Sequence, residues 1–329
     1  MKVFLGIDVG SVSTNIALMT EAGQVLDYTY LRTRGQPIQA LQEGLKEIGR
    51  ALPPTAEVAG VATTGSARHL AGVLVGADIV KNEITSHAVA ALQYYPEVQT
   101  VVEIGGQDSK IIIVRQGTVV DFAMNTVCAA GTGSFLDQQA ARLGIPIEEF
   151  GAYALRSRSP SQIAGRCTVF AETDMIHKQQ MGHAIADIVA GLCDALVRNY
   201  LNNVAKGKEL LPPVVFQGGV AANLGIRNAL QRALSTEIIV PPQYHVMGAI
   251  GAAILAKDRL GGNGHSAFRG FEIGSKESRT SSYECPDCPN ACEIIEVFIE
   301  DRMIARWGDR CGKWQFQEIH QSQERGVGG

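Results

Sequence analysis

Residues 5–18 read LGIDVGSVSTNIAL, and residues 102–114 read VEIGGQDSKIIIV. Each stretch predicts an apolar strand, a carboxylate, a turn of glycines and small polar residues, and a returning apolar strand. Glycine lets the backbone approach a ligand closely, so such a turn can present its N–H groups to phosphate. A single copy is equally typical of an ordinary hairpin, but two copies predict a chain with two similarly folded halves.

A third glycine-containing element lies further along the chain. Residues 214–230 read VVFQGGVAANLGIRNAL, which predicts a strand, the pair Gly218 and Gly219, and a helix with Asn223 near its start. Glycines at this point would let a nucleotide base or ribose lie against the backbone. The alternative is a plain strand-to-helix turn.

Composition and charge exclude several classes of protein. The chain has 329 residues, of which 46% are hydrophobic and 19% are charged, so it can build a sizeable core. Its 29 basic and 33 acidic residues give a net charge of −4, which argues against binding nucleic acid through bulk charge. No apolar run approaches the ~18 residues of a membrane span. The start, MKVFLGIDVG, enters a strand pattern at once and leaves no room for a signal peptide, so we expect a cytoplasmic protein with no membrane partner.

We expect three parts along the chain. Residues 1–97 form the first half, and residues 98–260 form the second half, whose final Gly- and Ala-rich helix packs back on the first. Residues 261–329 begin as a linker poor in large apolar residues and continue as a Cys-rich tail.

The seven cysteines of a cytosolic chain of this length are expected to be metal ligands or core thiols rather than disulfides. Cys193 falls in the apolar stripe of a predicted helix over 185–204, so we interpret it as a small buried residue. The tail carries four cysteines at a spacing that suffices for a structural zinc or a second iron–sulfur cluster, with free thiols as the alternative. They are Cys285, Cys288, Cys292 and Cys311.

Seven motifs in one order carry a resemblance to a known family. They are GIDVGSVSTN (6–15), GVATTGSARHL (60–70), KNEITSHA (81–88), EIGGQDSK (103–110), MNTVCAAGTGSFLDQQA (124–140), GRCTVFAETDMI (165–176) and FQGGVAAN (216–223). Over roughly residues 1–260 the chain resembles the ATPase activators of 2-hydroxyacyl-CoA dehydratases and the ATPase subunits of benzoyl-CoA reductases. That group belongs to the actin, Hsp70 and sugar-kinase superfamily. The resemblance implies duplicated actin-like, ribonuclease H-like α/β halves with a nucleotide cleft between them, plus a small Cys-rich C-terminal extension. No Walker A pattern occurs, which excludes a P-loop.

The resemblance implies a site for ATP or ADP with Mg²⁺. The expected catalytic residues are Asp8, Glu103 and Asp108, and Asp8 and Asp108 would hold Mg²⁺ through water. Glu103 stands where this superfamily commonly has Asp, a departure that puts its share in positioning the attacking water in question. Lys110 is expected to face solvent rather than the phosphates. The expected nucleotide contacts are Gly10, Ser11, Val12, Ser13, Thr14, Gly105, Gly106, Gln107, Gly218, Gly219 and Asn223.

Cys128 and Cys167 each precede a predicted helix, where partial positive charge favours thiolates and anionic clusters. A [4Fe–4S] cluster usually takes four cysteines, and a twofold homodimer would supply two from each chain. We therefore predict one oxygen-sensitive cluster per dimer between identical chains, and the resemblance implies the same. The alternative is two unrelated core cysteines. Glu172, near the expected interface, is a candidate relay between nucleotide and cluster.

The resemblance implies an ATP-dependent electron donor. ATP binding and hydrolysis in each subunit would drive low-potential electron transfer from the bridging cluster to a partner iron–sulfur enzyme. That partner would be an acyl-CoA dehydratase, an aromatic-CoA reductase or a related double-cluster reductase, and the upstream donor a ferredoxin or flavodoxin. The main alternative is a non-redox phosphotransferase of the same superfamily, such as a sugar or acetate kinase. An Hsp70-like peptide-binding ATPase is disfavoured because no β-rich domain is expected after residue 260.

Overall fold

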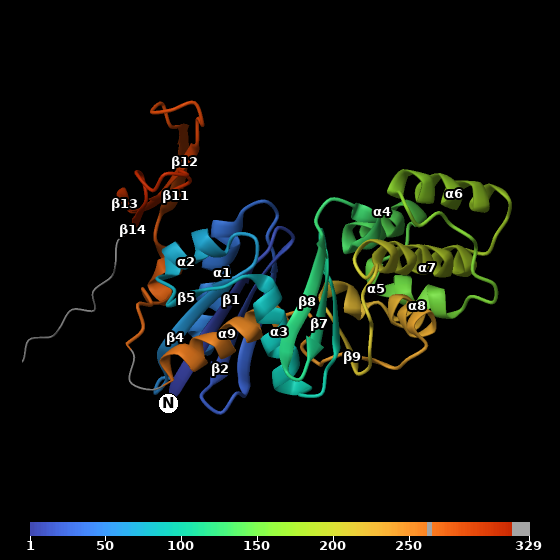
Figure 1. Ribbon diagram of the computed structural model, residues 1–329, viewed down its shortest axis with the longest axis horizontal. Coiled ribbons are helices and arrows are strands. Elements are labelled where there is room, and N and C mark those ends of the chain that lie inside the picture. Colours follow the sequence, from blue (N-terminus) through green and yellow to red (C-terminus); the bar gives the residue numbers. More distant parts are fainter. Residues whose placement is uncertain (262–264, 318–329) are drawn as a thin grey trace, which may run out of the picture. The chain divides into compact units, whose positions relative to one another are not determined.

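The computed structural model describes residues 1–261 and 265–317 and separates the chain into two compact units. Unit 1 contains Met1–Ser86 and the C-terminal part from Gly248, and unit 2 contains His87–Met247 (Figure 1). A five-stranded sheet lies at the centre of each unit, and each sheet contains both parallel and antiparallel pairs. The α/β class and the two similarly folded halves are therefore confirmed.

The sheet of unit 1 has the strand order β3-β2-β1-β4-β5, in which β1 is antiparallel to β2 and parallel to β4. The elements are β1 (Lys2–Val9), β2 (Ser13–Thr20), β3 (Val25–Arg32), α1 (Pro37–Ala51), β4 (Glu57–Thr64), α2 (Arg68–Val75), β5 (Ile79–Val80), α3 (Glu83–Tyr94) and α9 (Met247–Leu260). Helix α3 crosses the boundary with unit 2, and α9 begins at that boundary. Side chains of Val3, Leu5 and Ile7 form one buried cluster with residues of α1 and α2.

The opposite face of this sheet packs against α9, backbone to backbone. A methyl group at Gly6 would lie 1.9 Å from the carbonyl oxygen of Ala249 and 2.4 Å from the nitrogen of Ala253. Only a residue without a side chain fits this contact, and small residues in α9 let the helix come this close. Because side chains alternate along a strand, Asp8 projects to the same face of β1 as Gly6.

The sheet of unit 2 has the order β10-β9-β6-β7-β8, in which β6 is antiparallel to β7 and parallel to β9. The elements are β6 (Thr100–Ile104), β7 (Ser109–Arg115), β8 (Thr118–Asn125), η1 (Ala129–Gly131), α4 (Gly133–Leu143), α5 (Ile147–Leu155), α6 (Thr168–Gln180), α7 (Ile185–Asn203), β9 (Val214–Gln217), η2 (Gly219–Ala222), α8 (Leu224–Leu234) and β10 (Ile238–Ile239). This connectivity repeats that of unit 1, with β6, β7 and β9 in the places of β1, β2 and β4.

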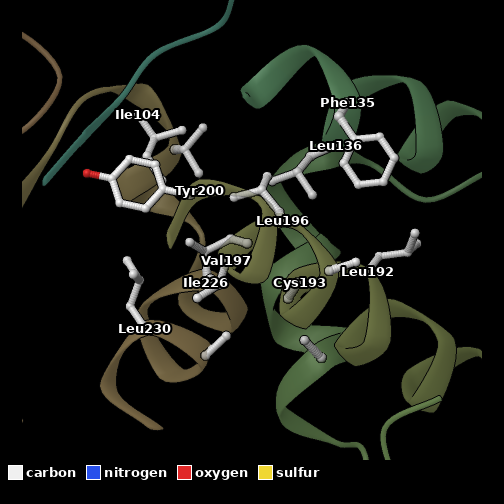
Figure 2. Packing of buried hydrophobic residues seen from close by; sticks show 14 of the residues in the cluster. Ile104, Phe135, Leu136, Leu192, Cys193, Leu196, Val197, Tyr200, Ile226 and Leu230 are labelled. Atoms are coloured by element: carbon white, nitrogen blue, oxygen red, sulfur yellow. The ribbon is translucent and has the colours of Figure 1, made fainter. Parts of the chain in front are cut away.

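Helix α7 supplies much of the core of unit 2. Its residues Leu196 and Tyr200 pack beside Ile226 of α8 (Figure 2). Cys193 is 1% exposed and burial raises the pKa of its thiol far above the usual range, so its interpretation as a core residue is confirmed. Although α7 has 19 residues, no helix in the described part of the chain is both long and apolar enough to cross a membrane.

The C-terminal part contains a sheet that the sequence analysis missed. Its elements are η3 (Phe271–Ser275), β11 (Ser278–Glu284), β12 (Glu293–Ile299), β13 (Arg302–Trp307) and β14 (Phe316–Gln317), and the four strands follow one another antiparallel. Val297 and Ile304 lie in the same buried cluster as Leu45 of α1. The expected linker and Cys-rich tail did not include this sheet, which belongs to unit 1 rather than to a separate β-rich domain. A few alternating apolar residues suffice here, because they pack on α1 and α2 rather than form a separate core.

Candidate functional site

The two sheets repeat the same cross-strand register around one carboxylate each. In unit 1, Asp8 of β1 is paired with Asn15 of β2 and with Thr64 of β4. The counterparts in β6, β7 and β9 of unit 2 are Glu103, Lys110 and Gln217. Residues paired directly across a sheet project to one face, so each carboxylate shares its face with two polar side chains. The duplication therefore extends to individual residues.

The β1–β2 turn of unit 1 closes on itself through Gly10. The Gly10 N–H donates to the carbonyl oxygen of Ser13 at 2.9 Å, and the hydroxyl of Thr33 donates to the carbonyl oxygen of Gly10 at 2.8 Å. Thr14 is buried with its hydroxyl 3.0 Å from that of Thr33, whereas Ser11 is exposed at the tip. Of the predicted phosphate contacts, Thr14 thus shapes the turn, while Ser11 is accessible to a ligand.

Polar atoms around Asp8 leave a place for bound water. Asn15 Oδ1 and Thr64 Oγ1 are buried and make no hydrogen bond within the described residues. Buried polar atoms are ordinarily hydrogen-bonded to protein or water, so a bound water molecule could donate a hydrogen bond to each of these two oxygens. Gly65 completes the site: its φ is +91°, and a methyl group there would lie 2.5 Å from Asp8 Oδ1. Oxygen acceptors around a carboxylate suit a hydrated Mg²⁺ ion.

The β6–β7 turn of unit 2 holds a buried lysine. Lys110 is 2% exposed, and its Nζ lies 2.9 Å from Glu103 Oε2 and 2.8 Å from Asp108 Oδ1. The expectation that Lys110 faces solvent is wrong, because its register places it on the face of Glu103, where a buried carboxylate requires a counter-charge. The turn itself repeats that of unit 1, since the Gly105 N–H donates to the carbonyl oxygen of Asp108 at 3.0 Å and Gln107 is exposed at the tip.

Glu103 is the buried acid of this turn. Burial, with a smaller contribution from the negative charge of Asp108, raises its pKa to about 7 against the opposing effect of Lys110. Gly218 lies directly beside it: φ is +91°, and a methyl group there would lie 2.6 Å from Glu103 Oε1. The third glycine element is thus in contact with the carboxylate, as Gly65 is in unit 1. An acid that titrates near neutrality can take a proton at physiological pH.

Asn223 has a visible structural role. Its Oδ1 accepts a hydrogen bond from the Ile226 N–H at 3.1 Å, which caps the N-terminus of α8. Gly219 begins η2, the short helix that leads to this cap. Their expected contact with the nucleotide stays a prediction.

Four residues of these faces are not among the predicted site residues. Asn15, Thr64, Gly65 and Gln217 all lie within motifs that were recognised, GIDVGSVSTN, GVATTGSARHL and FQGGVAAN. The available signal was that a glycine follows β4 and β9 alike, at Gly65 and Gly218. Their positions beside the carboxylates depend on strand register, which the motifs alone do not reveal.

Unit 2 also brings the segments of Cys128 and Cys167 together. Cys128 precedes η1 and Cys167 precedes α6. Cys128 Sγ lies 3.8 Å from the carbonyl oxygen of Arg166, the residue before Cys167. Asn125 holds the first segment, because its Oδ1 accepts from the Cys128 N–H at 2.9 Å and its Nδ2 donates to the Cys128 carbonyl at 2.7 Å. Both cysteines are half-buried, so neither is enclosed in the core.

Large apolar side chains are exposed next to each of these cysteines. Val127 is 96% exposed, and Val169 and Phe170 are each 65% exposed. Apolar side chains grouped in this way are typical of an interaction surface. Glu172, the candidate relay, forms an ion pair with Arg142 of α4 at 2.8 Å.

The tail cysteines are arranged differently. The Cys285 N–H donates to the carbonyl oxygen of Cys292 at 2.8 Å, and the indole N–H of Trp314 donates to Cys285 Sγ at 3.1 Å. Cys285 is buried, whereas Cys288 and Cys311 are exposed. Across residues 1–261 and 265–317, no three His, Cys, Asp or Glu side chains are gathered so that they could hold a metal ion. The described side chains therefore do not form an assembled four-thiolate site.

In sequence and in fold, the chain is similar to known ATPases. Residues 5–256 match the BadF/BadG/BcrA/BcrD ATPase family. The chain is 35% identical, over 77% of its length and 96% of the relative, to the (R)-2-hydroxyglutaryl-CoA dehydratase activating ATPase of Acidaminococcus fermentans. The crystal structure of component A of that organism's dehydratase superimposes with a TM-score of 0.72 at 32% identity, covering 79% of this chain and 100% of the other. The activator of 2-hydroxyisocaproyl-CoA dehydratase from Clostridium difficile with bound ADPNP gives a TM-score of 0.69 at 31% identity, covering 79% and 96%.

Proposed function

The chain belongs to the BadF/BadG/BcrA/BcrD ATPase family, and on that premise we propose that it is an ATP-driven electron donor for a partner metalloenzyme. The relatives named as activators of acyl-CoA dehydratases support a partner of that kind. An aromatic-CoA reductase or a related double-cluster reductase has the same requirement for a strongly reducing electron. In each cycle the chain accepts one electron from a ferredoxin or flavodoxin, passes it to the partner, and hydrolyses ATP to ADP and phosphate.

The two carboxylate faces have different roles in the hydrolysis. Asp8, with Asn15 and Thr64 beside it, would hold Mg²⁺ through water, and Mg²⁺ would supply charge neutralisation for the phosphates. Glu103 orients the attacking water and takes its proton, which a pKa of about 7 permits. Lys110 holds the Glu103 and Asp108 carboxylates in place. Asp108 would be a second residue to hold Mg²⁺ through water.

The pair of adjacent cysteine segments carries the redox part of the proposal. Cys128 lies against the residue preceding Cys167, and both cysteines are half-buried beside exposed apolar residues. Two such chains would bring four thiolates together, the number that a [4Fe–4S] cluster takes. The cluster, when bound, supplies a one-electron store. Val127, Val169 and Phe170 would then be covered by the second chain, which explains their exposure in one chain.

The decisive experiment is metal analysis of the chain purified without oxygen. We expect about four irons and four sulfides per dimer, with the visible absorption of an iron–sulfur cluster. Cys128→Ser and Cys167→Ser should each lose this iron and retain ATP hydrolysis, whereas Cys288→Ser, at an exposed tail position, is the matched control. Zinc or iron that remains in Cys128→Ser would belong to Cys285, Cys288, Cys292 and Cys311, which we retain as a separate proposed metal site.

Two results would overturn the redox proposal. One is a wild-type chain that is free of iron after anaerobic purification. The other is ATP-dependent phosphorylation of a sugar or acetate that Cys128→Ser leaves intact, which would make the chain a phosphotransferase. Co-purification from anaerobic extracts would then identify the partner of a chain that passes both tests.

A further inference from the structure

Two neighbouring residues of α7 contact the carboxylate turn and the cysteine segments of unit 2, respectively. The first is Tyr200, whose side chain is fully buried and whose hydroxyl donates to the carbonyl oxygen of Lys110 at 2.8 Å. Its ring lies in the core beside Ile104, and its hydroxyl projects away from the apolar side chains (Figure 2). Tyr200 thereby fixes the backbone of the residue whose ammonium group holds Glu103 and Asp108.

The second is Asn199, which is 1% exposed and faces the cysteine segments. Its Nδ2 donates to the carbonyl oxygen of Gly165 at 2.6 Å and lies 3.4 Å from that of Arg166 and 3.8 Å from Cys128 Sγ. A methyl group at Gly131 would lie 2.8 Å from Asn199 Oδ1, so the side chain is confined on that side as well. One amide group therefore touches the segments of both cysteines.

Helix geometry makes these two contacts move together. Successive side chains of an α-helix diverge by about 100°, so adjacent residues face different neighbours, and the backbone rises only ~1.5 Å between them. A shift of β7 at Lys110 that pulls on Tyr200 must therefore displace Asn199 and the cysteine segments that it holds. The buried position of both side chains leaves little room for the shift to be absorbed locally.

A second connection runs through α4. The Gly133 N–H donates to the carbonyl oxygen of Gly105 at 2.9 Å, and the hydroxyl of Ser134 donates to that of Gly106 at 2.6 Å. This route links the β6–β7 turn to the segment of Cys128, which leads into α4 through η1. Asn199 of α7, in contrast, contacts Gly165 and Arg166, which precede Cys167, in addition to the segment of Cys128.

We propose that Asn199 and Tyr200 are positioning residues that couple the nucleotide state of the Glu103–Asp108 turn to Cys128 and Cys167. This inference rests on the proposed function and names the contacts that carry its regulation. Tyr200 acts through the carbonyl group of Lys110. Asn199 acts through the carbonyl groups of Gly165 and Arg166. Asn199 also contacts the proposed cluster ligand Cys128 directly, with Nδ2 lying 3.8 Å from its Sγ.

The test measures the two thiols rather than turnover. The full-length chain is treated with iodoacetamide, with ADP or with a non-hydrolysable ATP analogue, and alkylation of each cysteine is followed by mass spectrometry. We expect the two nucleotides to change the rates at Cys128 and Cys167 by at least about fivefold, within the usual range of coupling between sites. Cys288, exposed in the tail, serves as the internal control and should not respond. If a cluster is present, the rate of iron loss to a chelator is measured in parallel.

Tyr200→Phe removes one hydroxyl and should reduce this response at both cysteines to less than about twofold. Asn199→Ala should do the same, whereas Tyr153→Phe, on α5, should keep the full response. Ser134→Ala should retain the response at Cys167, because it removes one side-chain hydrogen bond between α4 and the β6–β7 turn and leaves the contacts of α7 intact. Wild-type responses in both Tyr200→Phe and Asn199→Ala would overturn the proposal, as would loss of the Cys167 response in Ser134→Ala alone.

Hydrogen exchange on the wild-type chain covers the case in which these variants do not fold. Exchange of the backbone amides in 126–134 and 163–168 should differ between the two nucleotides, and identical exchange in both segments would overturn the coupling. A nucleotide-binding titration separates the two proposals. A chain that binds no nucleotide defeats the proposed function and this inference with it, whereas an iron-free chain whose thiols respond defeats the cluster alone.

Discussion

Lys110 places an ammonium group at the register position that Asn15 occupies in unit 1. A carboxylate as buried as Glu103 is costly to ionise, and a cation held against it lowers that cost. Lys110 provides the cation from the neighbouring strand, 2.9 Å from Glu103 Oε2. The equivalent position in unit 1 is Asn15, whose Oδ1 is a buried acceptor without a hydrogen bond in the described chain. One duplicated register therefore places acceptor oxygens without a hydrogen bond in the described chain beside Asp8, and an ammonium group beside Glu103.

The pH dependence of ATP hydrolysis should report on Glu103. If Glu103 takes the proton of the attacking water, kcat/KM should rise with pH through an apparent pKa of about 7. Lys110→Met removes the interaction that lowers the pKa of Glu103, so the rising limb should move to higher pH. Steady-state rates between pH 5 and about 9 would measure the shift. A limb that stays in place in Lys110→Met would contradict the assignment.

The raised pKa of Glu103 should also affect the free energy of unfolding, which gives a test of this pKa that does not depend on activity. The folded chain binds the Glu103 proton more tightly than the unfolded chain, whose glutamate titrates near 4.5. The free energy of unfolding should therefore fall as pH rises from 4.5 through about 7, and Glu103→Gln should remove this part of the dependence. Urea denaturation of both chains across that range would show whether their slopes differ.

Helices α9 and α7 show two ways in which the residue composition of a helix determines how it packs against its neighbours. Helix α7 presents a stripe of large apolar side chains to the core of unit 2, as its periodicity predicted. Helix α9 instead uses small residues, because it meets β1 and α3 backbone to backbone. A methyl group at Gly251 would lie 1.8 Å from the carbonyl oxygen of Ser86, and one at Gly6 would be equally obstructed.

Gly6→Ala should destabilise unit 1 strongly. The added methyl group would lie within 2.4 Å of two backbone atoms of α9, which cannot move without displacing the helix. We expect a loss of about 3 kcal/mol in the free energy of unfolding, at the upper end for overpacked cores. Gly117→Ala is the control: its φ is +73° and the methyl group meets nothing within 4 Å, so only backbone strain of about 1 kcal/mol should appear. Chemical denaturation that ranked the two in the opposite order would show that the contact is not tight.

Exposed apolar side chains lie beside Cys128 and Cys167, where the proposed cluster would need a second chain to supply the other two cysteines. Val127 follows β8, while Val169 and Phe170 lie in the first turn of α6, next to Cys167. Burying three such side chains between chains would remove apolar area from water without disturbing either core. Under the proposed function, a dimer is a condition for a complete cluster site, because each chain would supply two of the four cysteines.

Phe170→Asp should separate the two chains. The side chain is 65% exposed, so the substitution should change the stability of the single chain by no more than about 0.5 kcal/mol. Sedimentation velocity under anaerobic conditions should show monomer for Phe170→Asp and dimer for Leu155→Asp, a matched exposed position on α5. Iron content should fall with the dimer. A Phe170→Asp chain that remains dimeric would place the interface elsewhere.

Local patterns were sufficient for much of this fold. The alternating apolar residues around LGIDVGSVSTNIAL and VEIGGQDSKIIIV predict paired strands, and their glycines predict tight turns, because both properties belong to neighbours in the chain. The periodicity of 185–204 predicts α7 and the burial of Cys193 for the same reason. The tail sheet escaped prediction because its few apolar residues gain their burial from α1 and α2, far away in sequence.

Contacts between distant segments required the folded chain. Strand register places Lys110 against Glu103 and sets Asn15 and Thr64 beside Asp8, and no motif specifies which residues of two strands face each other. Asn199 and Tyr200 read in the sequence as part of an apolar helix, yet they meet the cysteine segments and β7. Short-range periodicity determines which elements form and which sides of them are apolar. The chemistry at the carboxylates and thiols depends on pairings across many residues, which are chosen by packing of the whole unit.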